Sequence, residues 1–110
     1  MIARIWRGIV ERYDAVAYLE YLQRTTGVPD YQATSGNLGV TIPQRDVEDV
    51  VEFTLITYWE SMEAIRTFAG ENPERARYYP EDRRYLLDLE PTVEHFEVPF
   101  TDLPIGETRA

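Results

Sequence analysis

The chain has 110 residues, of which 44% are hydrophobic and 28% are charged, and it carries a formal net charge of −9. This composition is typical of one folded domain rather than of a disordered or fibrous chain. The absence of cysteine and the presence of one histidine exclude thiol chemistry, disulfides and a histidine-cluster metal site within one chain. The negative charge and the lack of a long apolar run argue against nucleic-acid and membrane partners. We therefore expect a cytoplasmic domain that holds no metal.

The first element that the sequence predicts is a strand over residues 2–10, where β-branched and aromatic residues are interleaved with arginines. A helix follows from Asp14, which is suited to the N-cap position, and apolar residues recur at helical spacing until Gly27 and Pro29 interrupt them. Residues 29–36 are polar and turn-forming, so we expect them to be a loop.

A second strand is expected over residues 37–42. Pro43 and the polar residues 44–49 predict the end of that strand and a hairpin loop. Residues 50–59 give the strongest strand prediction in the chain, because they are rich in β-branched and aromatic side chains. Alternation places on one face of this strand Val51, Phe53, Leu55, Thr57 and Trp59, and on the other face Glu52, Thr54, Ile56 and Tyr58.

The next predicted element is a second helix. Ser61 is its expected N-cap, apolar residues recur at spacings of three and four over 62–69, and Gly70 ends it. Pro73 then predicts a short helical piece over residues 74–77, because proline is preorganised for a first helical turn.

The last elements are short. Residues 80–89 predict a short helix, and Pro91 prevents its continuation into the final strand, which is expected over 92–98. The domain is therefore expected to span residues 1–98, with residues 99–110 as a C-terminal tail that forms no element alone.

The order of these elements predicts an α+β, ferredoxin-like βαββαβ fold: a four-stranded antiparallel sheet with both helices on one face. The strands carry apolar residues on both faces, and a sheet face without helices needs another cover. We expect that cover to be a second copy, giving a homodimer packed sheet against sheet, and hence a dimeric α+β barrel. The second copy would bury the set of side chains that faces away from the helices, which is either Ile56 with Tyr58 or Leu55 with Trp59.

Three stretches resemble the antibiotic biosynthesis monooxygenase family: Trp6-Arg7-Gly8 in the first strand, residues 55–65 at the junction of the third strand and second helix, and residues 94–98 at the end. The most specific piece is Trp59-Glu60-Ser61, and the likeness spans nearly the whole domain. Members of this family are dimeric α+β barrels, so the resemblance implies the fold predicted above.

The resemblance also implies a function. Some members oxidise polycyclic aromatic substrates with oxygen and without metal or flavin, and others degrade haem. The haem-degrading members use an asparagine on the first strand, a tryptophan after the third strand and a histidine on the second helix. Trp59 matches the tryptophan, but Trp6 and Arg7 stand near the asparagine's place, and the second helical region has no histidine. We therefore expect a cofactor-independent monooxygenase-like protein that acts on or binds a small aromatic or polyketide-like molecule.

The predicted catalytic residues are His95 and Tyr79. His95 is the one side chain whose unperturbed pKa lies near neutrality, so it is suited to proton transfer. The phenol of Tyr79, or of Tyr78, could hydrogen-bond a substrate oxygen. The structural alternatives are a surface or interface role for His95 and coverage of a helix end for the two tyrosines.

The predicted substrate-binding residues are Trp59, Trp6, Tyr78 and Arg7. The indoles of Trp6 and Trp59 could stack on a flat aromatic ligand, or could simply pack in the core. Arg4, Arg7 and Arg66 could each bind a ligand carboxylate or phenolate, or could pair with the abundant acids.

Two alternatives to an enzyme remain open at this stage. The chain could be a non-catalytic small-ligand-binding or stress-associated dimer that uses the same pocket without chemistry. It could also be the ligand-sensing domain of a transcription factor, which shares this topology, although the negative charge disfavours that hypothesis.

Overall fold

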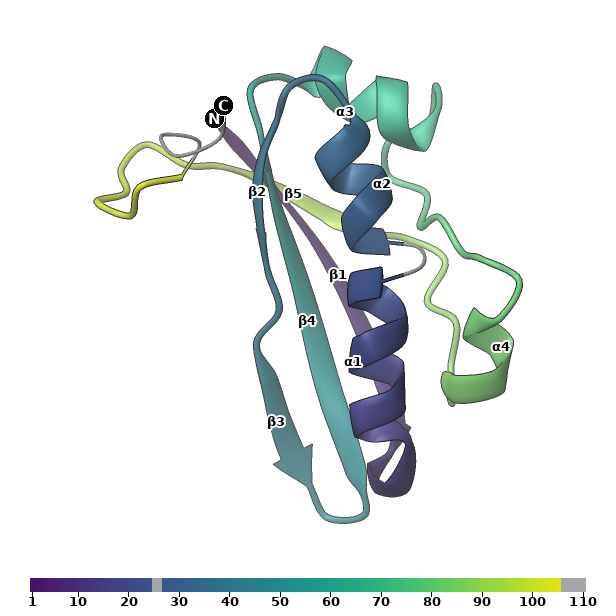
Figure 1. Cartoon of the computed structure of the whole chain (residues 1–110). Coiled ribbons are helices and arrows are strands. Elements are labelled where there is room, and N and C mark those ends of the chain that lie inside the picture. The colour runs from purple at the N-terminus through teal and green to yellow at the C-terminus, as the bar shows by residue number, and fades with distance from the viewer. Residues whose placement is uncertain (25–26, 106–110) are drawn as a thin grey trace.

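The computed structural model describes residues 1–24 and 27–105 of the chain, and it shows one antiparallel sheet with helices packed on one face (Figure 1). The elements in chain order are β1 (Ile2–Glu11), η1 (Arg12–Asp14), α1 (Ala15–Arg24), α2 (Gly27–Ala33), β2 (Asn37–Thr41), β3 (Gln44–Val47), β4 (Val50–Trp59), α3 (Met62–Ala69), α4 (Asp82–Tyr85) and β5 (Glu94–Glu97).

The sheet is built on two long central strands. β1 and β4 pair antiparallel over their full lengths, β5 pairs with the outer side of β1, and β2 and β3 pair with the outer side of β4. The predicted alternation along β4 is confirmed, because Val51, Phe53, Leu55, Thr57 and Trp59 are all buried. The α+β, ferredoxin-like fold predicted from the sequence is therefore confirmed.

The outer strand beside β4 is longer than predicted. Residues 44–47, expected to be part of a loop, form β3, which continues the pairing begun by β2. Pro43 interrupts the strand between them, because it has no N–H to donate, but its carbonyl still accepts a hydrogen bond from the Thr54 amide at 2.9 Å. The turn itself is confined to the two residues before β4, where Glu48 has φ 55°.

The helical layer also differs from the prediction. Residues 29–36 were expected to be a loop, but α2 runs from Gly27 to Ala33. Pro29 is compatible with this helix because it stands in the first turn, where the amide groups have no intrahelical acceptor. α1 begins directly after Asp14, as expected, although Arg12–Asp14 form a 3₁₀ turn.

The prediction for α3 is confirmed: Ser61 is its N-cap and accepts a hydrogen bond from the Ala64 amide at 3.2 Å, and Gly70 ends it. Residues 74–77 are not helical, contrary to the prediction. Arg75 instead forms an isolated bridge with Thr92, because the backbone around it pairs with the segment before β5.

The two remaining elements are shorter than predicted. The helix expected over residues 80–89 is the single turn α4, and the strand expected over 92–98 is reduced to β5. No helix in the part of the chain that the structure describes is long and apolar enough to span a membrane.

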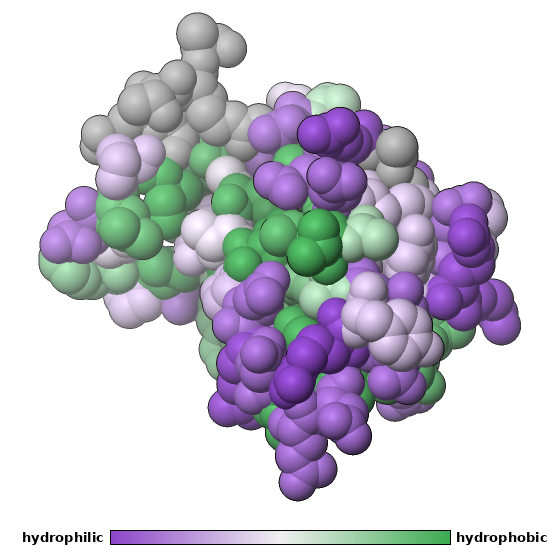
Figure 2. All heavy atoms as spheres, turned by 60° about the horizontal axis from the view of Figure 1, so that its bottom comes forward, coloured by the Kyte–Doolittle hydropathy of each residue, from purple (hydrophilic) through white to green (hydrophobic). Residues whose placement is uncertain are grey.

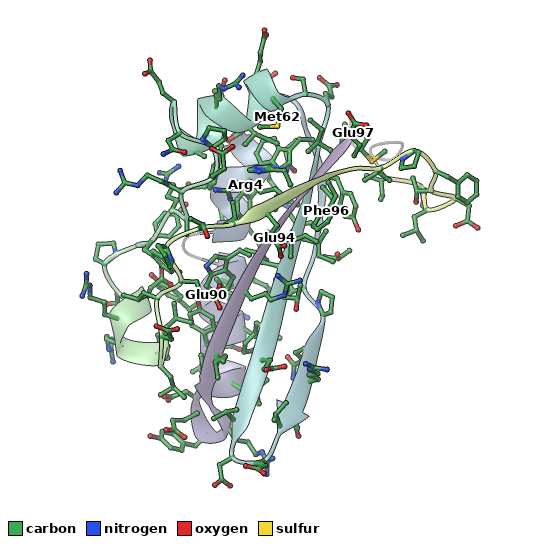
Figure 3. All side chains as sticks on the ribbon, turned by 180° about the vertical axis from the view of Figure 1, so that it is seen from behind. Arg4, Met62, Glu90, Glu94, Phe96 and Glu97 are labelled. Carbon is green, nitrogen blue, oxygen red and sulfur yellow. The ribbon has the colours of Figure 1, made fainter. Side chains whose placement is uncertain are left out.

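The two faces of the sheet differ sharply. The face toward the helices carries the aromatic core, whereas the open face presents the apolar side chains Ala3, Ile5, Ile9, Ile56, Tyr58 and Phe96. Phe96 is labelled in Figure 3, which views the molecule from behind. The segment after β5 adds Phe100 and Leu103, which are 80% and 56% exposed, and Figure 2 shows this segment as a hydrophobic lobe beside the grey atoms. Of the two sets considered for the open face, Ile56 and Tyr58 occupy it.

Candidate functional site

A cluster of aromatic and charged side chains lies between the sheet and the helices. It surrounds a small cavity of about 20 Å³, which is room for about one water molecule. The lining comes from β1, α1, α2, the segment 77–79, α4 and β4, and consists of Arg4, Trp6, Tyr18, Leu22, Gly27, Tyr31, Leu55, Arg77, Tyr78, Tyr79 and Asp82. We call this set the cavity cluster.

Trp6 forms one wall of the cavity cluster. Its indole Nε1 donates a hydrogen bond to the Tyr78 hydroxyl at 3.1 Å, and that hydroxyl donates to the Glu90 carbonyl at 2.5 Å. Gly8 permits this position, because a Cβ on Gly8 would overlap the six-membered ring of Trp6. The strand therefore needs glycine at this point so that the indole can lie over the backbone.

A buried carboxylate, Asp82, organises the second wall. Its Oδ1 accepts a hydrogen bond from the Tyr18 hydroxyl at 3.2 Å, and its Oδ2 accepts one from the Tyr79 amide at 2.7 Å. Burial raises the pKa of Asp82 above its ordinary value, and the two hydrogen bonds oppose that change. Burial also raises the pKa of Tyr18, so its phenol stays protonated.

The third wall carries an arginine above two aromatic rings. The guanidinium of Arg77 lies 4.8 Å from the ring centre of Phe68 and 5.2 Å from that of Tyr79, and it lies 3.6 Å from the carboxylate of Asp30. The Tyr79 hydroxyl donates to the same carboxylate at 2.6 Å. Burial and this hydrogen bond raise the pKa of Tyr79.

Arg4 is the most buried cation of the cluster, with 2% of its surface exposed. One terminal nitrogen donates to the Arg75 carbonyl at 3.0 Å, and the guanidinium lies 5.6 Å from the Phe68 ring centre. Its Nε is buried and has no hydrogen-bond partner among the described residues. Burial raises the pKa of the neighbouring Tyr31 to about 12, although Arg4 and Arg77 oppose that change.

The structure brings three of the predicted site residues together: Trp6, Tyr78 and Tyr79 all line the cavity. Trp59 is fully buried in the core beside them, where its Nε1 donates to the Thr57 hydroxyl at 2.7 Å and its ring packs on Tyr31 and Phe68. Trp59 therefore supports the cavity cluster from behind rather than lining the cavity.

His95 lies at the margin of the cluster. It pairs with Arg4 across the β1–β5 ladder, is partly buried, and has a buried Nε2 with no hydrogen-bond partner among the described residues. Burial and the positive charge of Arg4 lower its pKa, against the opposite effect of Glu74. The lowered pKa favours the neutral imidazole.

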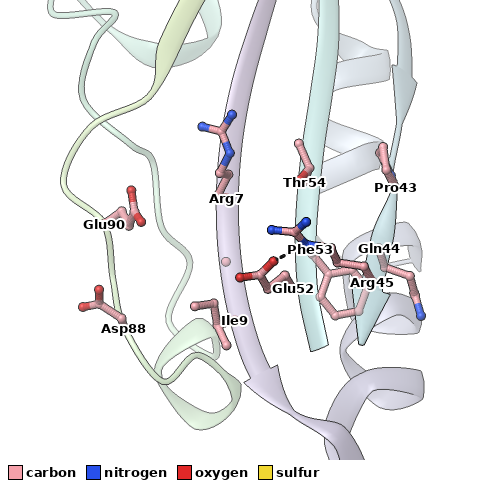
Figure 4. Close-up of a pocket in the computed structure, with 11 residues that line it drawn as sticks. Arg7, Ile9, Pro43, Gln44, Arg45, Glu52, Phe53, Thr54, Asp88 and Glu90 are labelled. Carbon is pink, nitrogen blue, oxygen red and sulfur yellow. Dashed lines mark hydrogen bonds and ion pairs between the residues drawn. The ribbon is translucent and has the colours of Figure 1, made fainter. Parts of the chain in front are cut away.

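Arg7 lies on the opposite face of the sheet. It forms an exposed ion pair with Glu94 at 2.5 Å and lines a second, larger cavity of about 350 Å³ between β3 and the segment 88–90 (Figure 4). In that cavity Arg45 pairs with Glu52, and Asp88 and Glu90 face them from the other side. Arg7 is thus separated from Trp6 by the sheet.

Several residues of the cavity cluster did not stand out in the sequence: Tyr18, Tyr31, Arg77 and Asp82. A usable signal existed for Arg4 alone, because alternation along β1 places it on the same face as Trp6. Within the described part of the chain, no three histidine or acidic side chains come together as metal ligands would.

No protein-family model and no curated protein matches the chain, but solved structures do. A candidate antibiotic biosynthesis monooxygenase from Bacillus cereus superposes with a TM-score of 0.60 and 15% identity, over 93% of this chain and 96% of that one. The heme-degrader MhuD from Mycobacterium tuberculosis, with two hemes in its active site, gives 0.54 and 22%, over 92% and 98%. A MhuD variant with two manganese protoporphyrins per active site gives 0.57 and 22%, over 92% and 97%. These structures share the fold that the family resemblance implied.

Proposed function

We propose that this chain belongs to the antibiotic biosynthesis monooxygenase family and binds a small aromatic molecule between its sheet and helices, which it oxidises without a cofactor. The observation that carries the proposal is the cavity cluster. Buried polar groups cost free energy unless they are paired, and a domain this small has little reason to bury Arg4, Asp82, Tyr18 and Tyr31 around one cavity for packing alone. An apolar site with a few convergent polar groups is the usual form of a ligand site.

The chemistry that such a site supports is oxidation of an ionised aromatic compound. In the simplest case a ring CH₂ group becomes a carbonyl: one atom of O₂ enters the substrate, and the other leaves as water with both hydrogens. The substrate must first lose a proton, so that its anion can transfer an electron to O₂. The protein's contribution is to stabilise that anion and to exclude water.

Residues in the cavity cluster, and His95 at its margin, can be assigned to these roles. The guanidinium groups of Arg4 and Arg77 stabilise the anion, and the rings of Trp6 and Tyr78 contact the aromatic body of the ligand. The Tyr79 hydroxyl donates to Asp30, and its oxygen can still accept a hydrogen bond from a substrate hydroxyl and so orient it. His95, whose lowered pKa favours the neutral imidazole, is the base beside Arg4.

The cavity holds only one small group when closed, so the ligand needs room from the segment that covers it. Residues 76–79 form no helix or strand, and the Ala76 amide is tied to the Pro91 carbonyl at 2.9 Å. Segments with few backbone hydrogen bonds open at low free-energy cost. We infer that this segment moves outward when the ligand enters.

Haem does not fit the residues at this site. The single histidine lies on an edge strand beside the cation Arg4, where a bound iron would face a guanidinium. The phenol of Tyr79 is already bonded to Asp30 and that of Tyr78 to the Glu90 carbonyl.

The active form that we propose is a homodimer joined through the open face of the sheet. Ile56 and Tyr58 lie there beside the apolar side chains of β1 and Phe96, and contiguous apolar surface is the usual mark of an interface. The absence of cysteine agrees with a reducing compartment such as the cytoplasm.

A second function is favoured by one observation. The hydroxyls of Tyr18, Tyr78 and Tyr79 are all engaged in hydrogen bonds. Among the described residues that line the cavity, the one carboxylate, Asp82, already accepts two hydrogen bonds. This arrangement suits a protein that binds the ligand without changing it.

The deciding experiment incubates the purified protein with tricyclic anthrones and naphthols, and follows thermal stability, oxygen uptake and product. An aromatic ligand that binds the folded state raises its melting temperature. Oxygen uptake with a carbonyl product, abolished in a Tyr79→Phe/His95→Gln double variant, supports the monooxygenase. Binding without product supports the second function, and no binding by any compound refutes both.

A further inference from the structure

We propose that Arg4 is the receptor for an oxyanion on the ligand, a carboxylate or an ionised phenol, so that the protein selects anionic aromatic molecules over neutral ones. This inference rests on the proposed function, because it names the class of ligand that the cavity cluster takes.

Arg4 is a buried cation without a counter-ion among the described residues. Among the described residues, no carboxylate forms an ion pair with it: the ion pairs of the structure involve Arg7, Arg12, Arg45, Arg77 and Arg84. A buried charge without a counter-ion is costly, and folded proteins normally supply a partner. Arg4 therefore keeps a buried charge that no carboxylate of the described residues neutralises.

The N–H donors of Arg4 are only partly satisfied by the described residues. A guanidinium has five N–H groups in a planar fork. The structure gives one terminal nitrogen a carbonyl partner and places the Tyr31 hydroxyl in hydrogen-bonding contact with the guanidinium, whereas Nε is buried and has no partner among the described residues. Because planar oxyanions match the fork of a guanidinium, an anion in the cavity would satisfy donors that the chain leaves open.

The acids near the cavity are bound to groups other than Arg4. The second cation of the cavity, Arg77, is shared with Asp30, which also accepts from Tyr79, and the buried Asp82 is occupied by Tyr18 and by the Tyr79 amide. The acids near the cavity are thus committed to other donors. Neither acid forms an ion pair with Arg4.

The buried charge of Arg4 should make the cavity select anionic over neutral ligands. A neutral ligand would leave the charge of Arg4 uncompensated in a dry site, whereas an anion would neutralise it. Charge-assisted hydrogen bonds to a guanidinium are about twice as strong as neutral ones. Selection should therefore favour the ionised member of any pair of similar aromatic compounds by about tenfold or more, and this preference should depend on Arg4.

The test measures binding of two matched pairs of probes by calorimetry. The first pair is 2-naphthoate and its neutral amide, 2-naphthamide, and the second is 4-nitrophenolate and its methyl ether, 4-nitroanisole. The protein variants are wild type, Arg4→Met, Arg4→Lys and Arg83→Met, the last being an exposed arginine on α4 that controls for loss of one positive charge.

We expect wild type and Arg83→Met to bind the anion of at least one pair about tenfold or more tightly than its neutral partner. Arg4→Met should remove that preference without weakening the neutral probe, and Arg4→Lys should retain part of it. The two pairs separate a carboxylate site from a phenolate site. Equal binding of anion and neutral partner by wild type overturns this inference and leaves the proposed function standing, whereas no binding of any probe overturns both.

A second measurement needs no ligand. If Arg4 is held for a ligand, replacing it with methionine removes an uncompensated buried charge, and the melting temperature of Arg4→Met should equal or exceed that of wild type. A melting temperature clearly below those of wild type and Arg83→Met would show that Arg4 serves the fold, and would contradict the inference.

Discussion

The indole nitrogen of Trp6 lies 3.1 Å from the hydroxyl of Tyr78, and this hydrogen bond joins two residues that are 72 positions apart in the chain. It fastens the irregular segment that covers the cavity to the central strand of the sheet. The two rings also meet edge to face, with centres 6.2 Å apart. The closed state of the candidate site depends on this pair.

Removing the Tyr78 hydroxyl should therefore weaken the protein. In Tyr78→Phe the indole N–H loses its acceptor and the Glu90 carbonyl loses its donor, so we expect a loss of about 1–3 kcal/mol in the free energy of unfolding. Urea unfolding measures this loss. Tyr13→Phe is the control, since Tyr13 is 82% exposed and should change stability by less than about 0.5 kcal/mol. Equal stabilities of the two variants would show that the Trp6–Tyr78 bond contributes nothing.

Gly8 should tolerate no side chain. In Gly8→Ala the added methyl group would overlap the Trp6 ring and crowd Leu86, and relieving such overlap in a packed interior costs about 1–3 kcal/mol. Thermal unfolding and the tryptophan emission spectrum measure the effect. Gly39→Ala is the matched control on β2, because its nearest contact would be Ile105 at 3.7 Å. A Gly8→Ala protein as stable as Gly39→Ala would mean that Trp6 does not lie over the strand.

Some features of this site are set by neighbouring residues and could be predicted from the sequence, whereas others depend on contacts between distant residues. The faces of β4 follow from alternation within ten residues, and the N-cap of α3 from Ser61 and its neighbours. The contact between Trp6 and Tyr78 has no such local signal, because it depends on the path of a segment without helix or strand. α2 was missed because Pro29 stops a helix at most positions but not in the first turn.

The partners of the arginines also depend on distant residues. The sequence offered Arg4, Arg7 and Arg66 as arginines that could bind an anion, and Arg7 was the one predicted to bind substrate. Alternation puts Arg4 and Arg7 on opposite faces of β1, but pairing with acids depends on residues far along the chain. In the structure Arg7 forms an ion pair with Glu94, whereas Arg4 forms none with a carboxylate of the described residues. Long-range pairing of this kind is set by the tertiary structure alone.

The stability of the protein should depend on His95 in mildly acidic solution. Burial and Arg4 lower the pKa of His95 below its ordinary value of 6.5, so between 6.5 and the lowered pKa the unfolded chain binds a proton that the folded chain does not. Stability therefore falls as the pH drops through this window. In His95→Gln that fall should be smaller, as measured by urea unfolding across the window. Parallel pH profiles of the two proteins would contradict the assigned shift.

The proposed dimer predicts a clear response to a charge on the open face. In Ile56→Lys the ammonium group would have to be buried between the two sheets, so the variant should sediment as a monomer whereas wild type sediments as a dimer. Val16→Lys is the control, because Val16 is a 76% exposed apolar residue on α1 and should leave the dimer intact. A monomeric wild type would refute the homodimer and leave the cavity cluster unaffected.

The central claim, that a ligand enters the cavity between sheet and helices, has its most direct test in the two indole N–H signals of the protein's NMR spectrum. Trp6 lines the cavity, whereas Trp59 is buried behind it with its N–H bonded to Thr57. On titration with 2-naphthoate we predict a large, saturable shift of the Trp6 signal and a smaller shift of the Trp59 signal. Saturable binding that leaves the Trp6 signal in place would put the ligand elsewhere and contradict the account.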